Sequence, residues 1–448
     1  MATSQPIAAT RTGTWPAGLE ASAQHQAAHD YLREGSGHLF VTGRAGTGKS
    51  TLLRCLKEAI TEEMVVVAPT GLAAVNVGGQ TIHSFFGFPP RLIRPDDIRR
   101  SRNGRLMRRL KFLVIDEVSM VRSDLMWAID QSLRVNRGRP REPFGGVRLA
   151  LFGDLHQLPP VINEAEVAEH LEAQHGGPFF FSLAALREGA GTALIELTQV
   201  FRQHDAALLA ILNHIRDGAV GRADLAVLNE RVRPIRTLAE GESYVILTPT
   251  NAAASRINLA YLAALPGQAS AYAAGISGEF NSAAHPTDEK LVLKPGAKVM
   301  LLRNDPERRW VNGSIARIAR LEAERVWIAL DGAEHGAEHE VEQVAWENRR
   351  YAYDKAQEKI VETVAGTFRQ FPLRLAWALT IHKSQGLTLD RVYLDLGRGA
   401  FAHGQTYVAL SRCRSLAGLA LARPLRGEDI LFDASVLGYR RLFEALIC

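Results

Sequence analysis

Short apolar runs alternate with amphipathic stretches along the first half of the chain. The runs cover Leu39–Thr42, Met64–Pro69, Phe112–Asp116 and Leu149–Gly153. Buried strands of a parallel sheet appear as continuous apolar segments, and the helices that connect them repeat every 3.6 residues. The pattern therefore predicts an α/β domain in which helices cover a parallel sheet.

A second pattern of the same kind begins near Glu196 and predicts strands at Tyr244–Pro249 and Arg391–Leu396. Between these two strands the pattern changes to short strands separated by Gly and Asn turns. They lie at Leu291–Leu302, Ser314–Ile318, Val326–Leu330 and Glu340–Val344. This spacing predicts a small β-barrel inserted into a second α/β domain.

Length and composition agree with a multidomain globular protein. A chain of 448 residues exceeds what one hydrophobic core supports, so two or three domains are expected. No apolar run approaches the ~18 residues of a membrane span, and no membrane partner is expected. Residues 1–18 lack the apolar core of a signal peptide, and residues 1–20 are interpreted as a disordered tail, with an organellar transit peptide as the alternative. Three widely spaced cysteines fit a reducing compartment and give no zinc site.

The segment Gly43–Ser50, with the sequence GRAGTGKS, matches the phosphate loop G-x-x-x-x-G-K-[ST]. Its glycines let backbone N–H groups close around phosphate oxygens, Lys49 reaches the β- and γ-phosphates, and the Ser50 hydroxyl can hold Mg²⁺. A strand at His38–Thr42 precedes the loop and an amphipathic helix at Ser50–Ala59 follows it, as anion binding at a helix N-terminus requires. The predicted ATP-binding residues here are Gly43, Ala45, Gly46, Thr47, Gly48, Lys49, Ser50 and Thr51.

Two acidic residues, Asp116 and Glu117, stand at the end of the predicted strand Phe112–Asp116. Asp116 is predicted to hold Mg²⁺, and Glu117 to orient or deprotonate the attacking water. The alternative is a buried strand with a polar end. Gln157 lies beyond the following strand, where its amide could detect a γ-phosphate or could make only local hydrogen bonds. Spacing alone leaves both interpretations of Gln157 open.

The motifs GRAGTGKS, APTGLAA, TIHSFFG, DEVSM and GDLHQLPPV together resemble the Pif family, close to RecD, in the 5′-to-3′ branch of superfamily-one DNA helicases. The second half agrees in order, with LTQVFRQ, FPLRLAW, TIHKSQG and YVALSR. The resemblance covers about residues 26 to 423. Leu155 and Leu208 stand where the family usually has Phe, and these apolar exchanges leave the chemistry unchanged.

The resemblance implies an α/β fold with two RecA-like parallel-sheet motor domains. The first spans 21–196 and carries a small strand-separating wedge at about 86–107. The second spans 197–290 and 373–448, and an SH3-like β-barrel at 291–372 is inserted into it.

The resemblance also implies roles around the nucleotide. Gln26 matches a glutamine that contacts adenine, and Gln157 becomes the γ-phosphate sensor. Arg202 and Arg412 match arginines that reach the γ-phosphate from the second motor domain, where they can be worth ~10³–10⁵ in rate. Gln385 and Gly386 would line the same cleft. The predicted catalytic residues are Lys49, Glu117, Gln157, Arg202 and Arg412.

Hydrogen-bond donors suited to phosphate, together with aromatic rings, mark the predicted DNA-binding face. Residue chemistry and the resemblance together place there Pro69, Thr70, His83, Ser84, Phe85, His382 and Lys383. Some alternatives stay open, because Phe85 and Phe86 could pack in the core and His382 could be an internally satisfied histidine. Trp310 is a weaker stacking candidate that could equally belong to the barrel core.

The stretch from Arg91 to Lys111 is strongly basic, with only Asp96 and Asp97 to balance it. A charge run is usually a solvated helix face. This one lies in the insertion that corresponds to the wedge, and the net charge of +5 also favours an anionic partner. DNA contact at the fork is therefore predicted for Arg94, Arg99 and Arg100.

The sequence thus predicts a monomeric, ATP- and Mg²⁺-dependent helicase acting on single-stranded DNA and ss/ds junctions. It would work in the bacterial cytoplasm at the nucleoid, or in the nucleus or mitochondrion of a eukaryote. Polarity and activity on G-quadruplexes or RNA–DNA hybrids come only from the resemblance. The rival interpretations are a motor subunit of a recombination nuclease, a non-unwinding ATPase switch or DNA-binding module, and a phosphate-loop small-molecule kinase.

Overall fold

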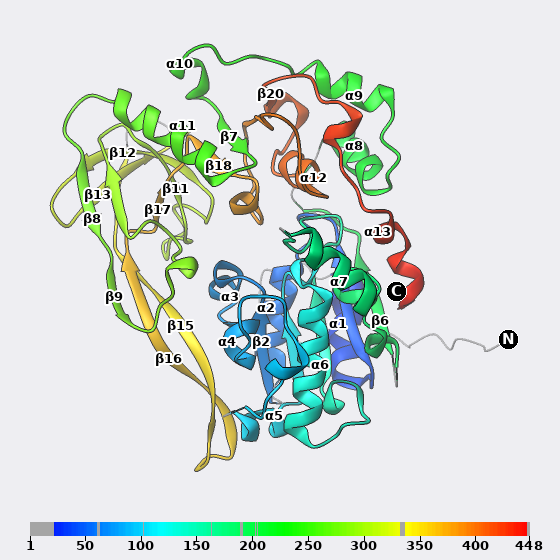
Figure 1. The fold of residues 1–448 in the computed structure, drawn as a ribbon. Coiled ribbons are helices and arrows are strands. Elements are labelled where there is room, and N and C mark those ends of the chain that lie inside the picture. The colour runs from blue at the N-terminus through cyan, green and yellow to red at the C-terminus, as the bar shows by residue number, and fades with distance from the viewer. Residues whose placement is uncertain are drawn as a thin grey trace.

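Two α/β domains and a β-rich extension make up the computed structural model (Figure 1). It describes residues 22–60, 63–101, 103–162, 164–188, 191–201, 203, 205–331 and 337–445. The predicted tail at 1–20 lies outside the described residues. Within the described ranges, every helix falls short of the length and hydropathy that a membrane-spanning helix requires.

The first motor domain is built on a wholly parallel sheet with the strand order β21-β6-β1-β5-β4-β2-β3. Its strands are β1 (His38–Gly43), β2 (Met64–Ala68), β3 (Gln80–Thr81), β4 (Phe112–Ile115), β5 (Arg148–Phe152), β6 (Thr192–Leu197) and β21 (Glu444–Ala445). Its helices are α1 (Ala23–Glu34), α2 (Lys49–Ala59), α3 (Gly71–Asn76), α4 (Ile82–Phe86), α5 (Gly104–Arg109), α6 (Ser123–Arg137) and α7 (Ala165–His175).

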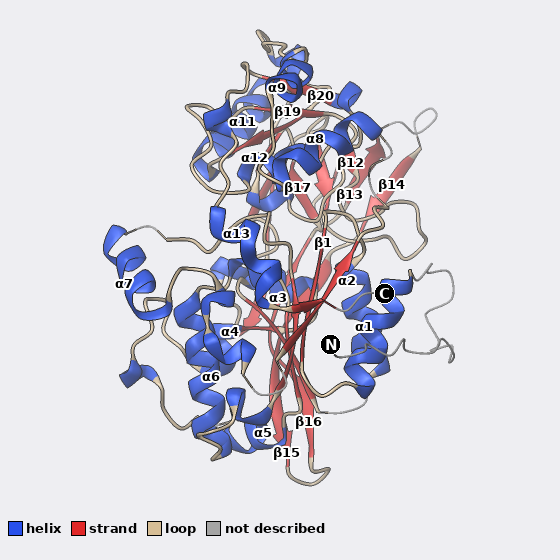
Figure 2. Ribbon diagram, turned by 90° about the vertical axis from the view of Figure 1, so that its right-hand side faces the viewer, coloured by secondary structure: helices blue, strands red, loops and turns tan. Residues whose placement is uncertain are grey.

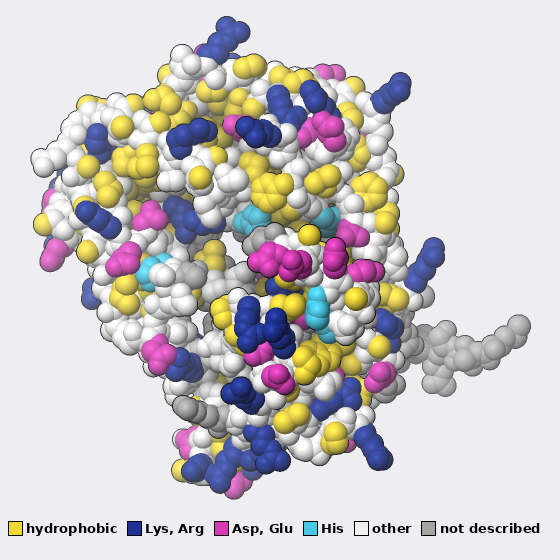
Figure 3. Space-filling model, viewed as in Figure 1, with side chains coloured by type: hydrophobic (Ala, Val, Ile, Leu, Met, Phe, Trp, Pro, Cys, Tyr) yellow, Lys and Arg dark blue, Asp and Glu magenta, His cyan; other side chains and the backbone are white. Residues whose placement is uncertain are grey.

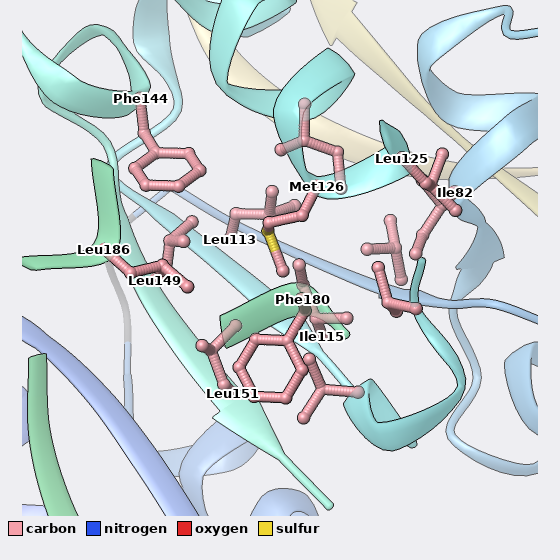
Figure 4. Close-up of a cluster of buried hydrophobic side chains, with 14 of the residues drawn as sticks. Ile82, Leu113, Ile115, Leu125, Met126, Phe144, Leu149, Leu151, Phe180 and Leu186 are labelled. Carbon is pink, nitrogen blue, oxygen red and sulfur yellow. The ribbon is translucent and has the colours of Figure 1, made fainter. Parts of the chain in front are cut away.

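Helices cover both faces of this sheet (Figure 2). Because side chains alternate along a strand, Leu39 and Val41 of β1 pack against α1 and α2, whereas Phe40 belongs to the cluster on the opposite face. Leu113 of β4 and Met126 of α6 lie in that second cluster, shown in Figure 4. Burial on both faces explains why these strands are apolar throughout.

The second motor domain carries a smaller parallel sheet with the order β18-β7-β19-β20. Its strands are β7 (Val245–Thr248), β18 (Ala378–Thr380), β19 (Val392–Leu394) and β20 (Leu419–Leu421). Its helices are α8 (Ala206–Arg216), α9 (Arg222–Asn229), α10 (Leu238–Gly241), α11 (Asn251–Ala264) and α12 (Gln405–Leu410), and the helix that follows, α13 (Ala434–Gly438), packs on the first domain. The prediction of two parallel-sheet domains is confirmed.

Antiparallel strands between β7 and β18 form an extension that we call the β subdomain. They are β8 (Ser270–Ala273), β9 (Gly275–Gly278), β10 (Lys290–Leu293), β11 (Lys298–Leu301), β12 (Ile315–Leu321), β13 (Val326–Leu330), β14 (Glu338–Val341), β15 (Val344–Asp354), β16 (Lys359–Gln370) and β17 (Leu373–Leu375). Because β8 pairs with β10 and β9 with β16, the β subdomain begins before the predicted residue 291. Its SH3-like assignment stays a prediction.

The predicted single strand Leu291–Leu302 is wrong. The chain turns at Gly296, where φ is +81°, and separates β10 from β11. The two strands enter different sheets, β10 beside β8 and β11 between β12 and β17. Both strands are apolar because each buries residues in the same cluster, and the Pro295-Gly296 pair between them is the turn signal that separates them.

The β15–β16 hairpin, which the sequence analysis did not predict, reaches from the β subdomain to the first motor domain (Figure 1). The Tyr351 hydroxyl accepts a hydrogen bond from the Val66 backbone N–H at 3.1 Å. Lys57 pairs with Glu362 at 2.9 Å. The hairpin therefore ties the β subdomain to the first sheet.

The chain returns to the first motor domain at its C-terminal end. Val436, Tyr439 and Phe443 are buried in the same core as Phe40, and the Phe40 and Phe443 rings lie 5.5 Å apart. Strand β21 then pairs with β6 at the edge of the first sheet. In the sequence, the second motor domain is thus inserted between β6 and β21 of the first.

Candidate functional site

The phosphate loop connects β1 to α2 in a conformation that its glycines make possible. Gly43 has φ of +153°, and a Cβ there would lie 2.6 Å from the Leu197 carbonyl oxygen. Gly48, with φ of +85°, is the N-cap of α2. An α-helix leaves its first N–H groups unpaired, so the loop points backbone donors at whatever anion it holds.

A cleft of about 600 Å³ lies between this loop and the second motor domain. Predicted residues that line it are Ala45, Gly46, Thr47, Gly48, Lys49, Ser50, Thr51, Glu117, Gln157, Gly386 and Arg412. The two halves of the site, far apart in sequence, therefore meet across one cleft. Its volume is in the range of small-ligand and cofactor sites.

Three further residues line the cleft that the sequence analysis missed: His25, Phe201 and Thr388. The His25 and Phe201 rings lie 6.4 Å apart, and the Phe201 N–H donates to the Gly46 carbonyl at 3.0 Å. These rings offer an aromatic wall suited to a planar base. Phe201 immediately precedes the predicted Arg202, which lies outside the described residues.

Three predicted nucleotide contacts lie outside the lining of the cleft. Gln26 is on α1, where its amide donates to Asp30 at 2.9 Å. Gly43 is buried at the end of β1. The Gln385 amide nitrogen is buried and has no hydrogen-bond partner among the described residues. An orphaned donor beside Gly386 fits a site built for a polar ligand.

Lys49 and the two acids face one another at the carboxyl edge of the sheet. The Lys49 Nζ donates to the carbonyls of Gly43 at 2.7 Å and Arg44 at 3.0 Å. Burial, reinforced by Glu117, raises the pKa of Asp116 to about 7. Burial also raises the pKa of Glu117, and the positive charges of Lys49 and Arg412 oppose that rise.

The donor set suits a hard divalent cation held partly by phosphate oxygens. In the described part of the chain no three His, Cys, Asp or Glu side chains come together as a metal site. Mg²⁺ typically uses one or two protein carboxylates together with substrate phosphates and water. The Ser50 hydroxyl at the start of α2 and the Asp116 carboxylate fit that arrangement.

Arg412 enters the cleft from the end of α12 and is held rigidly. Its side chain is 1% exposed, and Nε donates to the Val408 carbonyl at 2.9 Å. Nη2 donates to the Ser411 hydroxyl at 2.7 Å. A guanidinium fixed in this way loses little entropy when it meets a charged group.

The predicted DNA-binding residues divide between the two motor domains. Thr70 is the N-cap of α3, and its hydroxyl accepts from the Ala73 N–H at 3.2 Å. Pro69 precedes it, and Ser84 is exposed on α4. His83 and His382 are half-buried, with pKa values lowered by burial, and Lys383 is exposed.

Phe85 is a correction to the predicted DNA-binding set. It is 1% exposed and its ring packs against Phe86 at 4.8 Å and Tyr351 at 6.2 Å. The aromatic positions of this segment therefore form core around the hairpin. Trp310, 7% exposed, likewise belongs to the core of the β subdomain.

The predicted wedge is a loop with a short 3₁₀ turn at Pro95–Asp97, followed by α5. Arg94, Arg99 and Arg100 are all exposed. Lys and Arg side chains gather at the lower end of the molecule in Figure 3, where α5 meets the hairpin tip. Exposed arginines of this kind suit contact with a phosphate backbone.

Replacing Arg94, Arg99 or Arg100 with alanine is expected to flatten the slope of log K for single-stranded DNA against log salt by about 0.7 per true contact. The measurement is a fluorescence anisotropy titration at several salt concentrations. Arg91→Ala is the matched control, because Arg91 is already paired with Asp97 at 2.7 Å. An unchanged slope in all three variants would rule out phosphate contact by the wedge.

Comparison with known proteins identifies relatives over nearly the whole chain. The sequence model of the PIF1-like helicase family matches residues 21–221. The ATP-dependent DNA helicase Pif1 of Bdellovibrio bacteriovorus is 35% identical over 439 residues, covering 96% of this chain and 93% of the relative.

Solved structures of Pif1 from Bacteroides have a fold similar to that of this chain. In complex with ADP-AlF4, that protein matches with a TM-score of 0.85 at 34% identity, covering 94% of this chain and 97% of the other. In complex with ADP-AlF3 and ssDNA, it matches with a TM-score of 0.65 at 35% identity and the same coverage. The arrangement here is thus more similar to the ADP-AlF4 complex than to the complex with ADP-AlF3 and ssDNA.

Proposed function

The chain belongs to the PIF1-like helicase family and is an ATP-dependent DNA helicase, and from this premise we propose that it moves 5′ to 3′ along single-stranded DNA and uses Mg²⁺ with ATP. The observation that carries the proposal is the split site. Lys49 and Glu117 lie on one motor domain, Arg412 lies on the other, and all three line one cleft. Hydrolysis in such a site depends on how the domains are placed.

Each charged residue of the cleft has a distinct chemical task. Mg²⁺, when bound, neutralises phosphate charge, and the Ser50 hydroxyl and Asp116 carboxylate would hold it. Lys49 binds phosphate oxygens, and Glu117 orients the attacking water and takes its proton. Arg412 neutralises the negative charge that develops during phosphoryl transfer.

Movement along DNA requires that the protein grip the strand differently in its nucleotide states, since a ligand bound equally by both states shifts nothing. The DNA-binding face around Thr70 lies against the β subdomain here. Gly71 packs on Ala284 so closely that a Cβ on Gly71 would lie 2.5 Å from the Ala284 Cβ. We propose that the β subdomain moves off this face when single-stranded DNA enters.

The lower similarity to the ssDNA complex of the Bacteroides relative supports that movement. The contacts that must break include the Lys57–Glu362 pair, the Val66–Tyr351 hydrogen bond and the packing of Tyr351 against Phe85. Activity on G-quadruplexes or RNA–DNA hybrids, a monomeric working form and the cellular location stay predictions.

Strand displacement with 5′-tailed and 3′-tailed duplexes tests the proposal, with wild type compared with Lys49→Ala. We expect wild type to open only the 5′-tailed duplex in the presence of ATP and Mg²⁺, and Lys49→Ala to open neither. Opening of only the 3′-tailed duplex would contradict the polarity. DNA-stimulated hydrolysis without displacement would instead favour an ATPase switch.

A further inference from the structure

The loop that carries Gln157 is held by the second motor domain at several points. It follows β5 and begins with Asp154, whose side chain is fully buried. In Figure 1, α8 and α12 of the second domain face this edge of the first sheet. The contacts between them link the cleft to the position of that domain.

Within the loop, the Asp154 carboxylate fixes the amide of Gln157. Oδ2 accepts a hydrogen bond from Gln157 Nε2 at 3.2 Å, and Oδ1 accepts from the His156 N–H at 3.2 Å. Because the Gln157 amide nitrogen donates to the Asp154 carboxylate, the position of the Gln157 amide oxygen is also fixed. Asp154 thus determines how Gln157 faces the cleft.

Two side chains of the second domain converge on the same carboxylate oxygen. Arg216, the last residue of α8, lies 3.5 Å from Asp154 Oδ2 through Nη1 and 3.3 Å from Glu196 Oε1 through Nη2. The Tyr407 hydroxyl of α12 lies 3.5 Å from Asp154 Oδ2. Arg216 is 4% exposed and Tyr407 is 2% exposed, so these contacts are sheltered from water.

The charges support the same geometry. Burial opposes ionisation of Asp154, yet the positive charges of Arg216, Lys49 and His156 hold its pKa below the ordinary value. A buried carboxylate that stays charged needs a partner such as Arg216. Removing the guanidinium would therefore disturb Asp154 itself and not only its contact with α8.

Backbone contacts hold the loop from the same side. The His403 Nε2 donates to the Leu155 carbonyl at 3.0 Å. Gly404 lies so close that a Cβ there would be 2.2 Å from the Gln157 carbonyl oxygen. Even a methyl group at Gly404 would push the second domain away from the loop.

We propose that Arg216 and Tyr407 are positioning residues for hydrolysis, which act through Asp154 to orient Gln157 only when the two motor domains are closed. This inference rests on the proposed ATP-driven function. Closure of the motor domains would then position two groups in the cleft. Arg412 would be positioned directly, and Gln157 through Asp154. Opening the domains would release the amide and stop hydrolysis before the next step.

The test measures kcat and KM for ssDNA-stimulated ATP hydrolysis in Arg216→Gln, Tyr407→Phe and Gln157→Ala variants. Loss of a charged hydrogen bond predicts a kcat for Arg216→Gln that is roughly 10- to 100-fold lower, with KM for ATP changed less than about threefold. Tyr407→Phe keeps the buried ring and should lower kcat by roughly two- to tenfold. Arg222→Gln, at an exposed arginine on α9, is the control.

A double-mutant cycle gives the decisive readout. If Arg216 acts through Gln157, Arg216→Gln should lower kcat no further once Gln157 is alanine. Additive losses in kcat would overturn the proposal, because a general structural defect would persist without Gln157. The Tyr407→Phe and Gln157→Ala cycle gives the same test if Arg216→Gln fails to fold. A wild type without DNA-stimulated hydrolysis would refute the proposed function instead.

Discussion

Replacing Arg412 with alanine is expected to lower kcat for DNA-stimulated ATP hydrolysis by about 10³- to 10⁵-fold, the range for an arginine finger. The side chain is held by the Val408 carbonyl and the Ser411 hydroxyl, so its charge is aimed before the reaction begins. Because this charge acts mainly on the transition state, ATP binding should change far less than kcat. Steady-state hydrolysis and equilibrium nucleotide binding measure the two effects separately.

Arg414→Ala provides the matched control for Arg412. Arg414 is 58% exposed and pairs with Asp390 at 2.8 Å, away from the cleft lining. Its removal should leave kcat within about twofold, as expected for a surface ion pair. Equal losses in the two variants would mean that a general loss of positive charge, and not the placement of Arg412, controls the rate.

Glu117→Gln is expected to lower kcat by about 10²- to 10⁴-fold, because the amide cannot accept the proton of the attacking water. Glu117 occupies a left-handed backbone conformation, with φ of 49°, two residues after the end of β4. The positive charges of Lys49 and Arg412 both act on its carboxylate, which therefore lies where the two motor domains meet. ATP binding should survive, and single-turnover hydrolysis with bound nucleotide measures the loss.

Glu166→Gln on α7 removes a carboxylate from an exposed site and serves as the control for Glu117. Its hydrolysis rate should match wild type. Retention of most activity in Glu117→Gln would show that another group takes the proton. The prediction would then fail even if Arg412→Ala behaved as expected.

The strands of the first sheet could be predicted because each is buried on both faces and is therefore apolar throughout. The predicted strand Phe112–Asp116 corresponds to β4, and Leu149–Gly153 to β5. The phosphate loop could be predicted because each fixed position of its motif has a specific role in binding phosphate or Mg²⁺. These signals are local, so a single sequence carries them.

Features that depend on distant contacts could not be predicted. The β15–β16 hairpin is mostly half-buried or exposed, and its one deeply buried tyrosine, Tyr351, bonds a strand 285 residues away in sequence. Polar neighbours in the sequence favour a DNA contact for Phe85, whereas in the fold its ring is buried against Phe86 and against Tyr351 of this hairpin. His25 lies outside every motif, Phe201 lies in LTQVFRQ without an assigned role, and only the fold brings the two rings to the cleft.

Strand β21 has a mechanical consequence for the motor. The chain crosses between the motor domains after β6 and crosses back before α13, so two separate segments join the domains. A body attached at one point can swivel in any direction, whereas a body attached at two points turns about the line between them. We expect opening and closing of the cleft to turn mainly about that line, so the path of the chain limits the direction of each ATP-driven movement.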